Sequence, residues 1–152
     1  NCKTWLNCEV GNSGDNFPRM IATAGRLVSP RLSIMDAVPA MEGQGPGAGA
    51  PRRMGLLMAS ADPVALDRVA VEVAGLDPAR MRTLAAAETI GWGETHLDKI
   101  EVAGLPICEA RLATPLVEPR MIPVGFSLPR VVKRTPKQQW LLLMNEPARR
   151  VP

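Results

Sequence analysis

The stretch 36–49, DAVPAMEGQGPGAG, constrains the fold of this chain more than any other. An apolar run at 31–38 leads into it, and a second apolar run, MGLLMA, follows at 54–59. Short apolar runs bounded by glycine and proline are typical of buried strands. The sequence therefore predicts two strands joined by a glycine-rich loop, which extends from Pro39 to about Arg53.

Three helices are predicted from their boundary residues. Residues 18–28 have helical spacing and proline at the first position, and a Ser-Pro pair ends the run. Two later segments, 62–75 and 77–91, share one pattern: an aspartate that can cap the helix, then proline, and finally glycine near the end. A further strand is predicted at 99–102.

The order helix, strand, loop, strand, helix, helix, strand favours an α/β fold in which helices cover a mostly parallel sheet. A chain of 152 residues is expected to bury one core of ordinary size. We assign residues 1–114 to this domain, which we expect to be incomplete at its N-terminus, and residues 115–152 to an extended, proline-rich, basic arm. One apolar patch in the arm, 137–145, is expected to dock on the body or on a partner.

Charge and cysteine content exclude several classes of function. The net charge of +3 comes from the arm, because the first 117 residues are slightly acidic. Basic residues without interleaved aromatic side chains make nucleic-acid binding unlikely and favour a solvated or protein-binding arm. The three cysteines form no CxxC pair, so we expect no iron–sulfur ligands in this chain and favour a reducing compartment, the cytoplasm. No apolar run is long enough for a membrane-spanning helix.

Two carboxylates flank the start of the predicted loop. Asp36 ends a predicted strand, where α/β proteins place their ligand crevice, and Glu42 follows six residues later. Carboxylates that converge across a turn bind a hard divalent cation, or one acts as a base while the other positions a substrate. The alternative interpretation is a turn aspartate and a solvated loop glutamate.

The glycines of the predicted loop suggest an anion site. In this hypothesis backbone N–H groups around Gly43 and Gly45 line a concave surface, with Arg52 and Arg53 close by. The next element is a strand, whereas a dinucleotide fingerprint is followed by a helix, and the lysine of a P-loop is missing. A flexible lid is the alternative.

Helical projection places Asp67 and Glu88 on the apolar sides of their helices. A buried carboxylate needs a cation, an arginine or backbone donors nearby, so Asp67 joins Asp36 and Glu42 as a candidate metal ligand. An internal salt bridge or a helix-cap bond is the alternative for both residues. His96, the single histidine, is expected to be a loop residue.

Four sequence blocks, in this order, resemble a known family. The blocks are DAVPAMEGQGPGAG (36–49), ASADPVALDRVAVEVAGLDP (59–78), ETIGWGE (88–94) and KIEVAG (99–104). They are similar to domain of unknown function 362, a family in which some members carry a ferredoxin-like iron–sulfur segment. This chain has no such cysteine series. The resemblance maps the characteristic positions of the family onto Asp36, Glu42, Gly43, Gly45, Pro46, Asp62 and Asp67.

These residues predict an uncharacterised domain that binds a small anionic ligand or a divalent cation such as Mg²⁺ at an acidic, glycine-rich loop. The expected ligand-binding residues are Asp36, Glu42, Gly43, Gly45, Pro46, Asp62 and Asp67, and the expected metal ligands are Asp36, Glu42 and Asp67. A redox accessory module and a structural subunit are the alternatives, and both would dock a redox protein or other subunit through residues 115–152. The sequence specifies no reaction, so the question whether the chain is an enzyme is left open.

Overall fold

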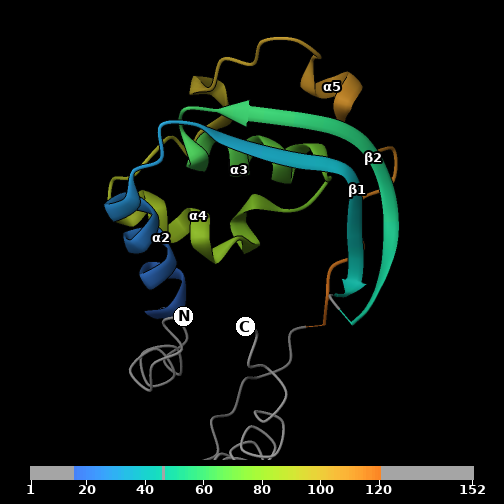
Figure 1. Ribbon diagram of the computed structural model, residues 1–152, viewed down its shortest axis with the longest axis horizontal. Helices are drawn as coiled ribbons and strands as arrows, with labels where there is room; N and C mark the ends of the chain where they lie inside the picture. Colours follow the sequence, from blue (N-terminus) through green and yellow to red (C-terminus); the bar gives the residue numbers. More distant parts are fainter. Residues whose placement is uncertain (1–15, 46, 121–152) are drawn as a thin grey trace, which may run out of the picture. The chain divides into compact units, whose positions relative to one another are not determined.

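The computed structural model describes residues 16–45 and 47–120 (Figure 1). The chain divides into two compact units, Asn1–Ile122 and Pro123–Pro152, and every described residue lies in the first. The apolar patch predicted at 137–145 and most of the predicted arm lie outside the described residues. No helix among the described residues is long and apolar enough to cross a membrane.

A long antiparallel hairpin dominates the first unit. Strand β1, Ser33–Gln44, pairs with β2, Ala48–Ser60, and in the described part of the chain these two strands form the whole sheet. The expectation of a mostly parallel sheet is therefore wrong for this part of the chain. Only three residues connect the strands, whereas a parallel pair needs a crossover of a dozen or more residues.

The predicted glycine-rich loop is wrong as well, because the ladder continues through it to the pair Gln44↔Ala48. The register shifts next to Val38, which lies across from both Met54 and Gly55. Gly55 has a φ of +72°, a value that glycine adopts without a steric penalty. An extra residue on one strand forms a β-bulge, and a bulge bends and twists the hairpin.

The first two predicted helices are confirmed. Helix α2 spans Asn16–Val28, and helix α3 spans Pro63–Val73. Asp62 caps α3, since its Oδ1 accepts hydrogen bonds from the main-chain N–H groups of the second and third residues that follow it, at 2.8 and 3.2 Å. Gly75 follows with a φ of +71°, the left-handed conformation predicted for its position.

The third predicted helix is split into two short helices. Asp77 caps a single 3₁₀ turn, η1, at Pro78–Arg80, and helix α4 begins one residue later, spanning Arg82–Thr89. The strand predicted at 99–102 is wrong. A 3₁₀ turn, η2, occupies Leu97–Lys99, and the chain then continues without a ladder partner to the short helix α5, Ile107–Ala110.

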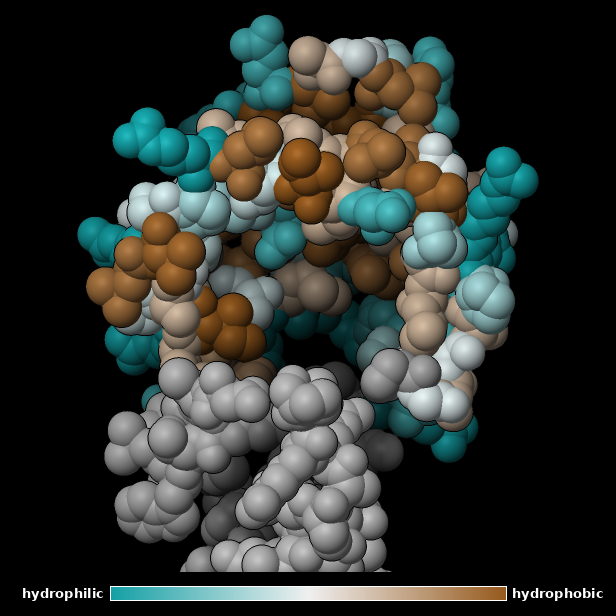
Figure 2. All heavy atoms as spheres, in the orientation of Figure 1, coloured by the Kyte–Doolittle hydropathy of each residue, from teal (hydrophilic) through white to brown (hydrophobic). Residues whose placement is uncertain are grey.

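Helix α3 packs against both strands of the hairpin, and α4 packs against α2 and α3 (Figure 1). Alanine and leucine dominate the core, whose buried members come from α2, α3 and α4: Ala22, Val64, Leu84, Ala86 and Ala87. Trp92 packs against this cluster beside Gly25, where a Cβ would overlap the indole ring. The other face of the hairpin carries exposed apolar side chains, visible as brown spheres in Figure 2.

Candidate ligand-binding site

A pocket of about 370 Å³ lies between the hairpin and the helices α3 and α4. Most of its wall is apolar, with alanine, valine and leucine side chains from the two helices and from Leu116. Four methionines also line it: Met35, Met54, Met58 and Met81. Its volume falls in the range of small-molecule sites, about 300 to 1,000 Å³.

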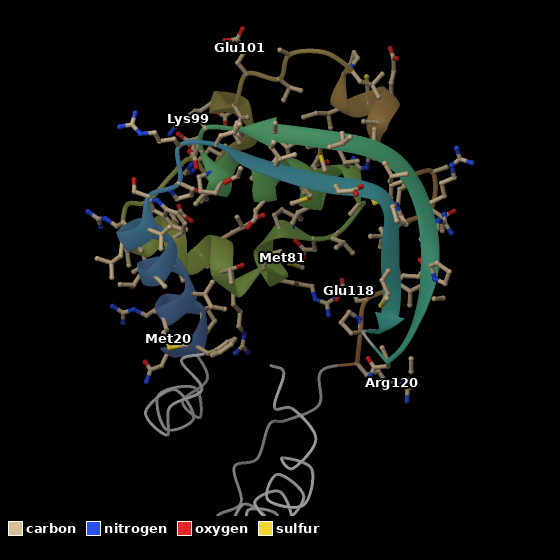
Figure 3. The ribbon with its side chains drawn as sticks, viewed as in Figure 1. Met20, Met81, Lys99, Glu101, Glu118 and Arg120 are labelled. Atoms are coloured by element: carbon tan, nitrogen blue, oxygen red, sulfur yellow. The ribbon has the colours of Figure 1, made fainter. Side chains whose placement is uncertain are left out.

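The strand alternation positions three of these methionines. Met35 and Met58 are cross-strand partners, and Met54 shares the half-buried face of β2 with Met58. Met81 lies between η1 and α4 and points into the space beneath the hairpin (Figure 3). Unbranched thioether side chains adjust their shape to different apolar ligands, so this wall suits a pocket with a variable occupant.

Asp67 on α3 contributes a carboxylate to this pocket. Asp67 is exposed, so the inward position predicted for it is wrong, although the surrounding protein removes part of the hydration of its carboxyl and raises the pKa of that group above its ordinary value. Within residues 16–45 and 47–120 it has no hydrogen bond or ion pair. The salt bridge considered as an alternative for Asp67 is therefore not formed with any described residue.

Asp36 belongs to the same pocket wall but differs from Asp67 in its bonding. Its Oδ1 accepts a hydrogen bond from the main-chain N–H of Val38 at 3.0 Å. The residue borders the pocket, but the alternation of β1 places its exposed side chain on the face that the helices leave uncovered. The carboxylate of Asp36 thus has a hydrogen-bond partner two residues away. This agrees with the alternative interpretation of Asp36 as a turn aspartate.

Glu42 lies away from the pocket, near the tip of the hairpin. Its Oε2 accepts from the main-chain N–H of Val117 at 3.3 Å, and the N–H of Gly43 donates to the carbonyl of Val117 at 2.8 Å. No group of three or more His, Cys, Asp or Glu side chains in the described residues could hold a metal ion. The cation site of Asp36, Glu42 and Asp67 therefore stays a prediction.

The glycines at the hairpin tip allow the chain to turn and leave room for the side chain of Met41. Gly43 has a φ of +76°, and its carbonyl accepts a hydrogen bond from the N–H of Gly45 at 2.9 Å. A Cβ on Gly45 or Gly49 would overlap the side chain of Met41. The N–H of Gly43 and the N–H of Gly45 each donate to a carbonyl of the protein, so they do not line an open anion site. Pro46 lies outside the described residues.

Asp62 has a structural role at the start of α3. Besides the two cap bonds, its Oδ2 accepts from the main-chain N–H of Glu94 at 2.7 Å. Its own N–H donates to Oγ of Ser60 at 3.0 Å. Three donors on one carboxylate leave little capacity for a ligand, so the capping role predicted for Asp62 is the one found.

His96 and two glutamates form an exposed cluster. Nδ1 of His96 lies 3.0 Å from Oε1 of Glu94, and Nε2 lies 3.8 Å from Oε1 of Glu88. The hydrogen bond from the main-chain N–H of His96 lowers the pKa of Glu94, with the imidazole contributing next. His96 is a loop residue as expected, whereas the inward position predicted for Glu88 is wrong because its side chain is exposed.

The methionine wall is the feature that sequence reasoning missed. Met54 and Met58 occur at even spacing in β2, together with the half-buried Leu56. Such alternation is the signal of a strand with one covered face. The apolar run 54–59 predicts a fully buried strand, for which no such alternation is expected.

Comparisons with known proteins agree with the resemblance carried by the motifs. Residues 2–72 match the family described as Domain of unknown function (DUF362). The chain is 35% identical over 157 aligned positions to Thylakoid-associated protein sll1697 of Synechocystis sp. (strain ATCC 27184 / PCC 6803 / Kazusa). That alignment covers 95% of this chain and 45% of the relative, so the chain spans less than half the length of the relative. No solved structure matches the chain. The chain is thus a partial-length match to the DUF362 family, and the matched segment contains the hairpin and most of α3.

Proposed function

We propose that this domain binds a small, largely apolar molecule with a positively charged or hydrogen-bond-donating group in the pocket beneath the hairpin. One observation carries the proposal. Asp67 is a carboxylate without a partner in the described structure, and it lies in a pocket walled by four methionines. Partial desolvation of an unpaired carboxylate is unfavourable, and a cationic group on a ligand would offset that cost.

The lining also discriminates between classes of ligand. Its polar and charged members are Asp36, Asp67 and Thr83, and no lysine or arginine contributes to it. This composition favours a cation over the anionic ligand suggested by the glycine-rich stretch. A divalent metal takes six or more oxygen ligands, whereas Asp67 is the one carboxylate of the pocket without a local hydrogen bond. An organic cation requires only one such contact.

Methyl-labelled methionine tests the proposal directly. The chain has eight methionines, of which four line the pocket, and Met20 and Met41 lie outside it. Phenethylamine is the probe and phenylpropionate is its matched anion. We expect the amine to shift the methyl signals of Met35, Met54, Met58 and Met81, and the anion to shift them less.

An Asp67→Asn variant completes the experiment, since it keeps the shape of the side chain and removes its charge. The preference for the amine over the anion should disappear in this variant. Equal shifts with amine and anion in the unaltered protein would contradict the proposal. Shifts confined to Met20 and Met41 would contradict it equally.

A second candidate function is association with a membrane surface. The exposed face of the hairpin presents Ile34 and Leu57, and Leu32 lies just before β1; each is at least 60% exposed. The relative from Synechocystis is described as thylakoid-associated. Exposed apolar patches mark interaction sites more often than free surface. The redox-partner and subunit roles predicted for residues 115–152 stay predictions, since most of that segment lies outside the described residues.

Sedimentation with vesicles of phosphatidylglycerol and phosphatidylcholine tests this second candidate. The double variant Ile34→Ser, Leu57→Ser should lose binding to the vesicles. A matched control is Leu27→Ser, Val28→Ser on α2, which removes two side chains of comparable exposure, 82% and 77%, from another surface. Equal losses in both variants would indicate nonspecific adsorption and reject this candidate.

A further inference from the structure

We infer that the groove between the free edge of β2 and residues 100–105 accepts an extended polypeptide strand from a partner protein. The groove has a volume of about 300 Å³. One wall is β2 from Leu56 to Ser60, the other is the segment 100–105, and α3 contributes Leu66 and Val69. This inference is independent of the methionine-lined pocket.

The first wall is a strand edge without a partner. Among residues 16–45 and 47–120, strand β2 pairs only with β1, and residues 56–60 make no main-chain hydrogen bond other than those of that pair. In an antiparallel pair, part of the N–H and C=O groups of each strand point away from the partner strand. Such a free edge is a template for the addition of another strand.

The second wall begins with extended backbone that belongs to no sheet, and the chain then bends at Gly104, which has a φ of +100°. Ile100 has φ −96° and ψ 116°, which are values of extended backbone. Residues 101–105 make no hydrogen bond with any described residue. Figure 1 shows the segment after η2 running alongside β2, and residues of both line the groove. A strand inserted between the two walls would pair with both.

The main-chain groups of the two walls determine which kind of molecule fits the groove. Only a polypeptide supplies alternating N–H and C=O groups on both of its edges at the repeat of a β-strand. The apolar side chains of α3 favour apolar residues at every second position of that strand. Residues 54–60 carry no charge, and the side chain of Glu101 points away from β2 (Figure 3). The β2 wall of the groove is therefore uncharged, and Glu101, on the opposite wall, is the one charged residue that lines it.

A second copy of this chain fits the groove less well than a single extended segment. Edge-to-edge pairing of two β2 strands would bring the segment 100–105 of each copy toward the β2 strand of the other. Both segments would then occupy the space that the pairing requires. An isolated strand has no such wall attached to it.

Binding of a synthetic peptide to the full chain tests the inference. The probe is a fluorescein-labelled octapeptide of alternating threonine and valine, and its control is the same peptide with every valine N-methylated. N-methylation removes donors and leaves the side chains unchanged. We expect fluorescence anisotropy to show binding of the first peptide and at least about tenfold weaker binding of the second.

Two substitutions at one position separate main-chain pairing from side-chain contact. Val102→Pro removes a main-chain donor that has no hydrogen bond in the free protein, so the fold should tolerate it. Val102→Thr keeps that donor. We expect the proline variant to bind the peptide at least about tenfold more weakly than the threonine variant. Circular dichroism of both variants checks that they are folded.

Hydrogen exchange of the full chain tests whether the peptide also pairs with the free edge of β2. Amides of residues 56–60 that point away from β1 should become protected when the peptide binds. Equal binding of the N-methylated peptide, or unchanged exchange at these amides, would overturn the inference. A concentration-dependent dimer that protects the same amides without peptide would also overturn it, because the occupant would then be a second copy.

Discussion

The main-chain N–H of Glu94 donates a hydrogen bond of 2.7 Å to Oδ2 of Asp62, which at the same time caps helix α3 through Oδ1. The two residues are separated by 32 positions in the sequence. One carboxylate therefore fixes both the start of a helix and the loop that follows Trp92. Gly93 allows this approach, because a Cβ there would overlap Asp62 and Val64.

Asp62→Ala should lower the free energy of unfolding by about 2 to 3 kcal/mol. Loss of a helix cap costs about 1 kcal/mol, and loss of a further hydrogen bond to a charged group adds about 1.5 kcal/mol. Asp77→Ala is the matched control, since Asp77 caps the short turn η1 through a single bond and is exposed. Urea unfolding followed by circular dichroism measures both. Equal losses of unfolding free energy in the two variants would show that the hydrogen bond between Asp62 and Glu94 adds no stability.

The local rules of helix capping explain why this part of the fold was predictable. Aspartate, proline and a closing glycine act within one or two turns, so 62–75 could be assigned without knowledge of the tertiary structure. The same pattern at 77–91 was less informative, because its helix is interrupted at Met81. Nothing in the local pattern distinguishes a 3₁₀ turn from the first turn of an α-helix.

The hairpin and the site depended on long-range pairing and were harder to predict. Asp36 and Glu42 lie six residues apart on one strand, and an unbroken alternation would place both on one face. The bulge opposite Val38 reverses the alternation, so Asp36 lies on the exposed face and Glu42 on the half-buried one. The helical projection predicts an inward position for Asp67, whereas the residue borders a pocket and is exposed.

Asp67→Asn should increase the free energy of unfolding at pH 7. The folded state raises the pKa of Asp67 above its ordinary value of 3.8, so the folded protein binds this proton more tightly than the unfolded chain. The charged carboxylate therefore destabilises the fold at pH values above its folded pKa. The difference between variant and parent should shrink as the pH falls toward about 3.8, and urea unfolding at several pH values measures it.

Glu94→Gln is the control, and we expect it to change the free energy of unfolding in the opposite direction. The hydrogen bonds from His96 lower the pKa of Glu94, so its charged form contributes stability above its unfolded pKa. That contribution is lost as the pH falls through the folded pKa. The variant should therefore be less stable than its parent at pH 7 and match it in acid. If the free energy of unfolding depended on pH in the same way in both variants, the opposite pKa shifts assigned to Asp67 and Glu94 would be contradicted.

Gly25→Ala should destabilise the protein by up to about 2 kcal/mol. Alanine in a helix interior normally gains about 1 kcal/mol over glycine, but the added Cβ overlaps the indole of Trp92, and overpacking costs about 1 to 3 kcal/mol. Gly47→Ala is the same chemical change in open space and should be close to neutral. Urea unfolding compares the two. A stabilised Gly25→Ala variant would show that Trp92 moves away at no cost.

Glu42→Ala should loosen the contact between the hairpin tip and residue 117. Val117 donates its N–H to Oε2 of Glu42 at 3.3 Å and accepts at its carbonyl from Gly43 at 2.8 Å. Removal of the carboxylate exposes the amide of Val117 while the bond from Gly43 persists, so exchange should accelerate at Val117 and change little at Gly43. Glu118→Ala is the control, because it removes the exposed ion pair with Arg80 and leaves the amide bond of Val117 intact. Hydrogen exchange followed by NMR separates the two amides. Unchanged exchange at Val117 in the Glu42 variant would mean that the carboxylate is free of the hairpin tip in solution and available to a ligand.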